Sequence, residues 1–330
     1  MKENDIRPKE LDKNKFKALE KDLEFLRSKY PNFIKVNCPA CDSSKFYHKF
    51  TKYGFNFDQC TNCRTVFMNP RATPEILSLF YKNSALYDYW NKYIFPASNE
   101  ARRLKIFKPR VSKISKLVKK YKINTNKVLE IGAGFGLFCE EFQKSFRKSE
   151  VIAVEPNKSL AESCTKKGIK TISEPIENVD SYEEYFSILA SFEVIEHLYS
   201  PCEFLLNCHR LLGKGGIIVL TCPNYEGFDI QTLGVSSESI DAEHVNLFNP
   251  RSIQHLMKRT GFEILECSTP GLLDAEIVRN KILENKLDLS EQPFLNSILV
   301  DKWDEIGNNF QSFLQQNNLS SNMWTVARKT

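Results

Sequence analysis

Long apolar runs are missing from this chain of 330 residues, since none approaches the roughly 20 residues that a membrane-spanning helix needs. The opening segment, MKENDIRPKELDK, is too charged for the apolar part of a signal peptide. Internal repeats and low-complexity segments are also missing, and apolar residues make up 42% of the chain, enough to build folded cores. We therefore expect a soluble, cytoplasmic protein with no membrane insertion, built as one large or two to three small domains.

An excess of one charge over the whole chain is missing as well. The net charge is +5, yet residues 101–127 hold 11 basic and no acidic side chains. The rest of the chain has 35 basic against 41 acidic side chains, a balance of −6. Basic character is therefore local, and the overall charge does not favour binding to nucleic acid. Apolar residues spaced by three and four over 98–122 predict a helix there, with a charged face that solvent covers by default.

Disulfide bonds are not expected among the ten cysteines, because the cytosol keeps thiols reduced. Six are scattered singly through apolar surroundings and are interpreted as small buried hydrophobic residues: Cys139, Cys164, Cys202, Cys208, Cys222 and Cys267. The other four form two CxxC pairs separated by eighteen residues, the spacing of a zinc ribbon. They are Cys38, Cys41, Cys60 and Cys63. Four thiolates fill the tetrahedral coordination of Zn²⁺ and leave no open position, so the predicted zinc is structural.

From Lys127 onward, apolar runs of four to eight residues alternate with amphipathic stretches, which is typical of βαβ units. Strands are expected at 127–133, 150–156, 169–175, 186–192, 216–222 and 262–268. Helices are expected near 137–147, 158–167, 201–212 and 250–260. The near-continuous Val, Ile and Leu content of the strands suits a parallel sheet buried on both faces.

The last ten residues, SNMWTVARKT, look like a final strand. We expect it to pair antiparallel with 262–268 in a hairpin that a helical insertion of about forty residues interrupts, placing the insertion near any substrate. The chain then divides into an N-terminal helix, a zinc ribbon, an aromatic and basic helical linker or lid, a ligand-binding α/β domain, and the helical insert. The expected bounds are 1–34, 35–70, 71–123, 124–270 with 320–330, and 271–319.

Three glycines, Gly132, Gly134 and Gly136, follow the first predicted strand of the α/β domain. Glycine lets the backbone turn sharply and approach a ligand closely, at the start of the next helix. A dinucleotide fingerprint requires G-x-G-x-x-G, but Leu137 stands where its third glycine belongs. The pattern is instead acidic-x-G-x-G-x-G and begins at Glu130.

This pattern resembles that of class I S-adenosylmethionine-dependent methyltransferases, whose fold is a Rossmann-like doubly wound sheet of six parallel strands and one antiparallel strand. The resemblance implies that Glu130 helps to hold the methionine end of S-adenosylmethionine. Glu155 lies 19 residues after Gly136 at the end of the second strand, where a carboxylate can accept hydrogen bonds from both ribose hydroxyls.

The same resemblance assigns the adenine contacts. Pro156 then borders the base, while the turn SEPIEN places Ile176 against the ring and Glu177 near the exocyclic amine. Glu174 is a weaker assignment in the same turn. The fourth strand ends in SFEVIEHL, similar to the FEVLEH signature of the family, and this places Phe192 at the ligand-binding edge of the sheet.

Candidate catalytic residues follow this signature. Glu193 and His197 lie at the end of the fourth strand, and Glu243 and His244 lie in a later loop that is expected to face the cofactor. His244 and His197 are the candidate general bases, with Glu193 and Glu243 orienting them or holding substrate hydroxyls. Three aromatic residues of the linker are expected to close the site: Tyr81, Tyr89 and Trp90.

The order of zinc ribbon, aromatic linker and methyltransferase motif over residues 35–270 resembles bacterial methyltransferases that act on deoxysugars or other glycan precursors. We therefore predict methyl transfer to a small polar acceptor: a sugar nucleotide, a nonulosonate or another surface-glycan precursor. A second catalytic half like that of sugar C-methyltransferases is missing, so oxygen, nitrogen and carbon all stay open as the acceptor atom. Two alternative hypotheses are an RNA methyltransferase and an inert scaffold that keeps the cofactor fold.

Overall fold

The computed structural model describes residues 1–330 and is built around a seven-stranded sheet. Its strands are β4 (Lys127–Ile131), β5 (Glu150–Val154), β6 (Lys170–Ile172), β7 (Phe186–Phe192), β8 (Leu212–Pro223), β10 (Phe262–Ser268) and β11 (Asn322–Lys329). They lie in the order β10–β11–β8–β7–β4–β5–β6. Strands β4 to β8 are parallel, whereas β11 is antiparallel to both β8 and β10. Six strands share one direction and one opposes them, which confirms the predicted fold class.

Strands β7 and β10 occupy the predicted residues, and the largest differences concern β6 and β8. Strand β6 is shorter than the predicted 169–175, because the chain leaves the sheet and enters the 3₁₀ turn η5 (Ile176–Asn178) after Pro175. Strand β8 begins before the predicted 216–222, because Leu212 already pairs with Phe186 of β7 ahead of the glycines. Tertiary pairing therefore extends a strand into a segment of low strand propensity.

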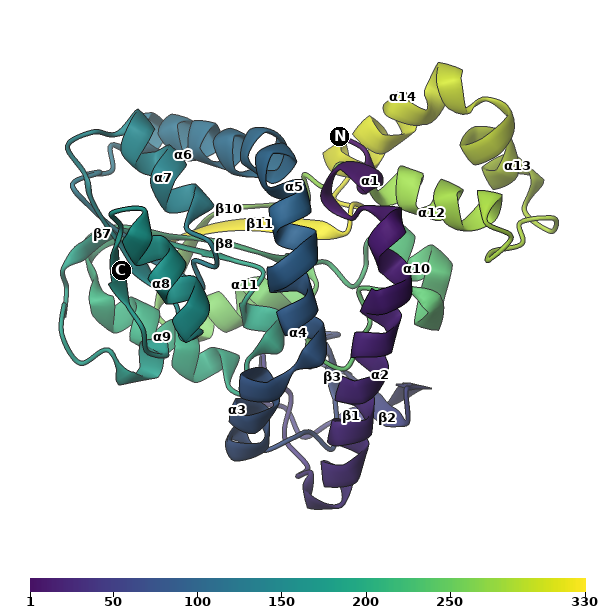
Figure 1. The fold of residues 1–330 in the computed structure, drawn as a ribbon, viewed down its shortest axis with the longest axis horizontal. Coiled ribbons are helices and arrows are strands. Elements are labelled where there is room, and N and C mark those ends of the chain that lie inside the picture. Colours follow the sequence, from purple (N-terminus) through teal and green to yellow (C-terminus); the bar gives the residue numbers. More distant parts are fainter.

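Helices cover both faces of the sheet (Figure 1). On one face, α6 (Lys108–Tyr121), α7 (Leu137–Ser145) and α8 (Lys158–Lys166) contribute apolar side chains to one core. On the other face, α9 (Pro201–Leu211) and α11 (Pro250–Arg259) contribute to a second core. Asn157, Ser200 and Asn249 cap α8, α9 and α11 by accepting backbone N–H groups of the first turn.

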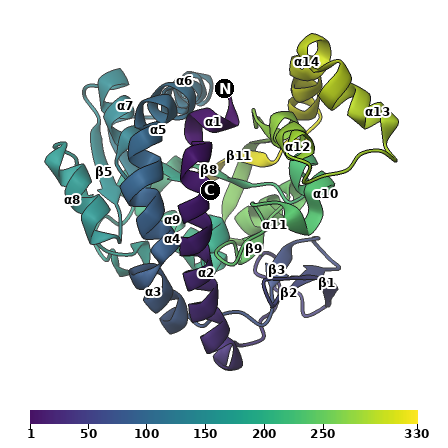
Figure 2. The same ribbon diagram turned by 45° about the vertical axis from the view of Figure 1, so that its right-hand side comes forward.

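A helical segment precedes the sheet, and its first two helices run beside α2 (Asp12–Lys29), as Figures 1 and 2 show. It consists of α3 (Pro74–Asn83), α4 (Ala85–Tyr89), the π turn η3 (Trp90–Ile94), α5 (Phe95–Arg102), the π turn η4 (Arg103–Phe107) and α6. The helix predicted over 98–122 is therefore interrupted by a π turn. Each π turn ends two residues before a proline, Pro96 or Pro109, and proline cannot donate the backbone hydrogen bond of a regular α-helix.

A second, smaller sheet joins the cysteine-rich segment to the rest of the protein. Strands β1 (Phe46–Lys52), β2 (Phe55–Cys60) and β3 (Val66–Met68) are antiparallel, and β3 pairs with β9 (Asn246–Leu247) from a loop that follows β8. Figure 2 shows β9 beside β3. Cys38, Cys60 and Cys63 belong to the same apolar core as α9 and α11. The ribbon and the large sheet are therefore packed together.

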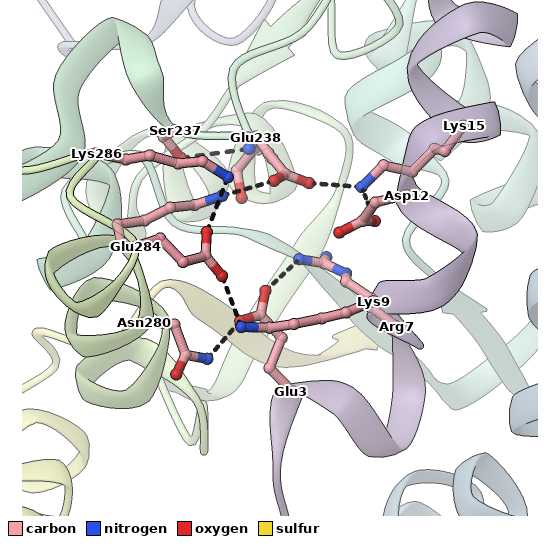
Figure 3. Close-up of polar contacts among 12 residues, drawn as sticks. Glu3, Arg7, Lys9, Asp12, Lys15, Ser237, Glu238, Asn280, Glu284 and Lys286 are labelled. Carbon is pink, nitrogen blue, oxygen red and sulfur yellow. Dashed lines mark hydrogen bonds and ion pairs between the residues drawn. The ribbon is translucent and has the colours of Figure 1, made fainter.

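The chain segment that connects β10 to β11 is helical. It contains α12 (Asp274–Leu283), α13 (Pro293–Asn296), the π turn η8 (Ser297–Asp301) and α14 (Trp303–Gln316). With α10 (Phe228–Leu233) they enclose a core of their own that includes Val278, Leu299 and Leu314. The N-terminal α1 (Glu3–Ile6) and η1 (Lys9–Leu11) contact α12 and the residues after it through polar side chains, among them an ion pair of 2.6 Å between Lys9 Nζ and Glu284 Oε1 (Figure 3). No helix is both long and apolar enough to cross a membrane.

Candidate active site

The glycine-rich turn after β4 has the backbone conformation that its sequence predicts. Gly132, Gly134 and Gly136 have φ angles of 73°, 53° and 69°, in the left-handed region that favours glycine. A Cβ atom at Gly132 would lie 2.5 Å from Val194 Cγ2, and one at Gly136 would lie 2.6 Å from Ile169 Cδ1. At Gly134, by contrast, no atom lies within 4 Å of the Cβ position. The turn therefore presents open space at its middle glycine, where a ligand can approach the backbone.

Glu155 at the end of β5 lies against this turn. Its carboxylate accepts a hydrogen bond from Gly134 N at 2.8 Å and another from Asn157 N at 2.9 Å. The side chain is buried, and burial raises the pKa of Glu155 while the two backbone N–H groups lower it. The carboxylate is therefore fixed beside the open face of the turn, at the position predicted for ribose binding.

Glu130 lies on β4, which is the neighbour of β5, and it is only 2% exposed. Burial raises its pKa to about 8, and the nearby Glu155 adds to the shift. The Cys139 thiol donates a hydrogen bond of 3.1 Å to Glu130 Oε2. The two predicted cofactor acids are therefore close to one another and on the same edge of the sheet, at the carboxyl ends of adjacent parallel strands.

The predicted adenine contacts have different surroundings. Pro156 and Glu177 are exposed, whereas Ile176 is buried in the core that α9 covers. Phe192 packs edge-on against Phe138 of α7, with ring centroids 5.0 Å apart, and the Arg110 guanidinium lies 4.4 Å from its ring centroid. The side chain of Phe192 is thus a core residue on the α6 and α7 face, because apolar neighbours and a guanidinium cover it.

Glu193 occupies the end of β7 in a conformation that is unusual for a non-glycine residue, with φ of 56°. Its Oε1 atom accepts hydrogen bonds from Thr221 Oγ1 at 2.5 Å, Arg110 Nη2 at 3.2 Å and Asn322 Nδ2 at 3.1 Å. Arg110 and Asn322 were not among the predicted site residues, because their contacts with Glu193 span 83 and 129 residues of sequence. The backbone strain persists because these contacts hold the side chain in place.

The two candidate bases lie together. The rings of His197, from the 3₁₀ turn η6 (Ile195–His197), and His244 have centroids 4.7 Å apart. Burial and the proximity of His244 hold the pKa of His197 well below its usual range. His244 Nδ1 lies 2.9 Å from the carbonyl oxygen of Ser239. The geometry brings together two imidazoles, of which His197 is held neutral and able to accept a proton.

Several buried polar atoms at this edge of the sheet have no partner within the protein. They are Asn91 Oδ1, Glu196 Oε1 and Oε2, His197 Nδ1 and Glu243 Oε1. Buried polar groups are nearly always hydrogen-bonded, so a set of unpartnered atoms indicates a ligand or ordered solvent. Glu196 is only 1% exposed, and burial together with the nearby Glu193 raises its pKa well above the usual range.

Glu196 was not among the predicted site residues, although it is adjacent to His197 in the sequence. What distinguishes it is its burial, which the sequence alone does not reveal. The structure also brings Glu196, His197 and His244 together, with one ligand-type atom of each within 4.8 Å of the others. A carboxylate with two imidazoles is a ligand set that divalent cations use.

Of the three aromatic residues predicted to close the site, only Tyr81 touches the candidate bases: its hydroxyl donates to the His197 carbonyl oxygen at 3.4 Å. Tyr89 instead donates to the carbonyl oxygen of Leu11 at 3.0 Å, because its helix turns this side chain toward the N-terminal segment. Trp90 packs against Phe95, with ring centroids 5.3 Å apart, and Phe95 in turn packs against Phe135 of the glycine turn.

Tyr87, on α4, was not among the predicted site residues. Burial raises its pKa, and the carboxylates of Glu155 and Glu243 raise it further. Helix α4 therefore brings one phenol near both the cofactor-side acid and the acceptor-side acid. Of the aromatic residues of the linker, Tyr81 thus contacts His197, and Tyr87 lies near Glu155 and Glu243.

The four predicted zinc ligands converge. Cys38 Sγ lies 3.4 Å from Cys63 Sγ, and Cys41 Sγ lies 3.5 Å from Cys60 Sγ. All four sulfur atoms lie within 4.8 Å of one another. Sulfurs bound to tetrahedral Zn²⁺ at about 2.3 Å are roughly 3.8 Å apart, so the group fits this ion with little adjustment.

The fold and this edge of the sheet define a methyltransferase domain of the S-adenosylmethionine-dependent class. The chain belongs to the family described as "Methyltransferase domain", whose profile matches residues 99–267. It is similar to the ubiquinone biosynthesis O-methyltransferase of Bradyrhizobium sp. (strain ORS 278), with 29% identity over 186 residues, 54% of this chain and 64% of that protein. The match to the enzyme of the same name from Caulobacter sp. (strain K31) has 31% identity over 103 residues, 30% of this chain and 41% of that protein.

The chain thus spans less than two thirds of the length of these curated relatives. Among solved structures, a SAM-dependent methyltransferase from Archaeoglobus fulgidus aligns with a TM-score of 0.49 and 19% identity, over 72% of this chain and 100% of that one. The family match begins at residue 99, after the four clustered cysteines and the helices α2 to α4.

Proposed function

We propose that this protein transfers a methyl group from S-adenosylmethionine to a small polar acceptor. The observation that carries the proposal is the open space at Gly134, bordered by the carboxylate of Glu155, which Gly134 N itself holds in place. Bound there, S-adenosylmethionine supplies an electrophilic methyl group on a sulfonium. What remains for the chain is to hold this nucleotide, to exclude water and to remove a proton from the acceptor.

On the cofactor side, the glycine turn leaves room for the nucleotide, and Glu155 accepts hydrogen bonds from its ribose hydroxyls. Glu130 faces the methionine end, where a carboxylate pairs with the ammonium group. Pro156 and Glu177 border the adenine, since both are exposed beyond the ends of β5 and β6. Ile176 supports this turn from the core rather than by lying open to the ring.

On the acceptor side, His197 and His244 are the candidate bases. The lowered pKa keeps His197 neutral at physiological pH, as a proton acceptor must be. In this proposal, Glu193 and Glu243 hold acceptor hydroxyls or orient the imidazoles. Tyr81 and Tyr87 exclude water by closing the linker over the site.

A hydroxyl-rich acceptor, such as a sugar nucleotide, a nonulosonate or another surface-glycan precursor, is supported by the chemistry of the unpartnered atoms. Burial raises the pKa of Glu196 and of Glu243 well above the usual range and so favours the protonated carboxyl, which both donates and accepts hydrogen bonds, while Asn91 Oδ1 accepts them. A hydroxyl group matches this mixed set, because it also both donates and accepts hydrogen bonds. An RNA acceptor is less well supported, because Arg103 and Arg110 of the basic segment are engaged with glutamates of the fold.

Calorimetric titration with S-adenosylmethionine tests the proposed function. The wild type is expected to bind one equivalent, and Glu155→Ala is expected to lose at least about tenfold in affinity, because each lost hydrogen bond to a charged group is worth about 1.5 to 3 kcal/mol. Glu162→Ala, an exposed carboxylate on α8, is the matched control and should bind as the wild type does. Absent binding, or equal affinity in all three proteins, would refute the proposal.

A further inference from the structure

Arg71, which follows β3, is the most deeply buried arginine of the protein, with 1% of its surface exposed. Its guanidinium donates hydrogen bonds to oxygen atoms on both sides of the junction between the ribbon and the large domain. The acceptors are Met68 O at 3.3 Å, Tyr199 O at 3.1 Å, Asn246 Oδ1 at 3.0 Å and Val245 O at 3.3 Å. One side chain therefore joins three segments that are far apart in the sequence.

No carboxylate accompanies this buried cation. The four acceptors are neutral oxygens, and the ionisable groups that act on the guanidinium are Tyr199 and the Cys38 thiol. Burial lowers the pKa of Arg71 to about 10, so the side chain stays charged at neutral pH. An unpaired buried charge is costly. A Zn²⁺ ion with four thiolates carries net negative charge, so the loaded cysteine group would supply the counter-charge that the protein otherwise lacks.

The segments that Arg71 joins lead directly to the candidate bases. Val245 and Asn246 follow His244, and Tyr199 lies two residues after His197. Asn246 extends the connection, because its Nδ2 atom donates to the carbonyl oxygens of the η6 segment that carries His197. These acceptors are Leu198 O at 2.7 Å, Glu196 O at 3.3 Å and Ile195 O at 3.4 Å.

Backbone pairing completes the junction. Met68 N donates to Val245 O at 3.0 Å, and Phe67 of β3 is the register partner of Asn246 in β9. Each histidine segment is thus tied to the ribbon by Arg71, directly or through Asn246, whereas the glycine turn and Glu155 have no contact with this junction among the hydrogen bonds above. The ribbon is therefore connected to the two histidines on the acceptor side of the site and not to the glycine turn on the cofactor side.

We propose that Arg71 is a positioning residue that transmits the zinc-stabilised fold of the ribbon to His197 and His244. The zinc site takes no part in methyl transfer in this scheme: its four thiolates would supply the negative charge that Arg71 lacks, and the loaded site would stabilise the ribbon. Arg71 with Asn246 sets the relative placement of the two imidazoles. The assignment of the histidines as acceptor-side bases rests on the proposed function, but the placement itself is measurable without any acceptor.

Histidine NMR provides the measurement, because the chain has five histidines and two are involved. Imidazole Cε1–Hε1 resonances are recorded at fixed pH for the wild type, Arg71→Lys and Arg71→Gln, with zinc content measured in parallel. The expected result in both variants is that the His197 and His244 resonances move beyond their linewidths. The signals of His48, His209 and His255 should keep their positions.

The two variants separate charge from geometry. Lysine keeps the positive charge but lacks the planar fork of the guanidinium, so Arg71→Lys should retain zinc and still displace the two histidines. Arg71→Gln should also weaken zinc binding in a chelator competition, by about 10- to 100-fold. Arg259→Gln is the matched control, because Arg259 Nη2 also bridges to the ribbon, at 3.2 Å from Asp42 Oδ2, yet has no contact with either histidine segment.

The proposal is overturned if folded Arg71 variants leave the His197 and His244 signals where the wild type has them, or if all five histidines move together. Should the Arg71 variants fail to fold, Asn246→Ser and zinc removal from the wild type, each checked by circular dichroism, must displace the same two signals for the proposal to stand. A wild type that does not bind S-adenosylmethionine would refute the proposed function, while the spectra would still decide the role of Arg71.

Discussion

Alanine substitution at Gly134 separates a glycine that a ligand requires from glycines that packing requires. The Cβ atom of Gly134→Ala meets no protein atom within 4 Å, so the only expected cost to folding is the left-handed backbone at φ 53°. That cost is about 1 to 2 kcal/mol. A loss of this size lowers the melting temperature by about 2 to 4 °C for each kcal/mol in a domain of this size class.

The same methyl group would occupy the space assigned to the nucleotide. We therefore expect Gly134→Ala to fold and yet lose at least about tenfold in affinity for S-adenosylmethionine, equivalent to about 1.4 kcal/mol. Gly168→Ala is the matched control, because Gly168 has φ of 76° and equally open surroundings but lies in the turn between α8 and β6. Thermal unfolding and calorimetric titration measure the two quantities.

Equal affinity in Gly134→Ala and Gly168→Ala would refute the placement of the nucleotide at this turn. Gly132→Ala provides a contrast on the stability side. Its Cβ atom would lie 2.5 Å from Val194 Cγ2, so steric overlap adds to the backbone strain and the melting temperature should fall further than in Gly134→Ala.

Three further predictions concern charge and metal. Burial raises the pKa of Glu130 to about 8, whereas an ammonium ligand favours its carboxylate, so binding of S-adenosylmethionine near pH 7 should release protons. The binding enthalpy measured in buffers of different ionisation enthalpy should therefore differ for the wild type but agree for Glu130→Gln. Glu238 forms ion pairs with Lys15 (Figure 3) and with Lys281. The effect of burial is outweighed by these two lysines, which lower the pKa of Glu238 to about 2, so its carboxylate contributes stability above about pH 4.5 that is lost as the pH falls toward 2. Glu238→Gln should cost about 1 kcal/mol at pH 7, after discounting for solvent screening of a part-exposed group, and thermal unfolding curves that coincide with the wild type at that pH would contradict the assignment. Metal analysis should find one zinc per chain, lost in Cys63→Ser and retained in the control Cys202→Ser; equal zinc in both would argue against the ribbon site.

The parallel sheet could be predicted from the sequence because its strands are short, apolar and buried on both faces. Strand β7 matches its predicted bounds for this reason, whereas β10, whose bounds also match, is a part-exposed strand at the edge of the sheet. Glu130 and Glu155 could also be identified from the sequence, since each lies at a characteristic number of residues from the glycines. Their common edge of the sheet follows from parallel pairing of β4 and β5.

Other features have no local signature. Strand β9 has only two residues, and its partner β3 lies about 180 positions earlier. No periodicity in the sequence therefore predicts this pairing, which joins the ribbon to the loop that contains His244. Burial of Glu196 and Arg71 likewise depends on contacts between distant segments. In the aromatic linker, composition alone did not show which rings contact the candidate site: Tyr81 donates a hydrogen bond to the His197 carbonyl oxygen, whereas Tyr89 donates one to Leu11.

A crystal structure of the protein with S-adenosylhomocysteine would show whether the nucleotide lies at the glycine turn. We expect the ribose hydroxyls within hydrogen-bonding distance of Glu155, the amino-acid end of the ligand toward Glu130, and the ligand passing over the backbone of Gly134. Density for the ligand at any other edge of the sheet, or a Glu155 carboxylate that touches only protein in the presence of saturating ligand, would contradict this placement.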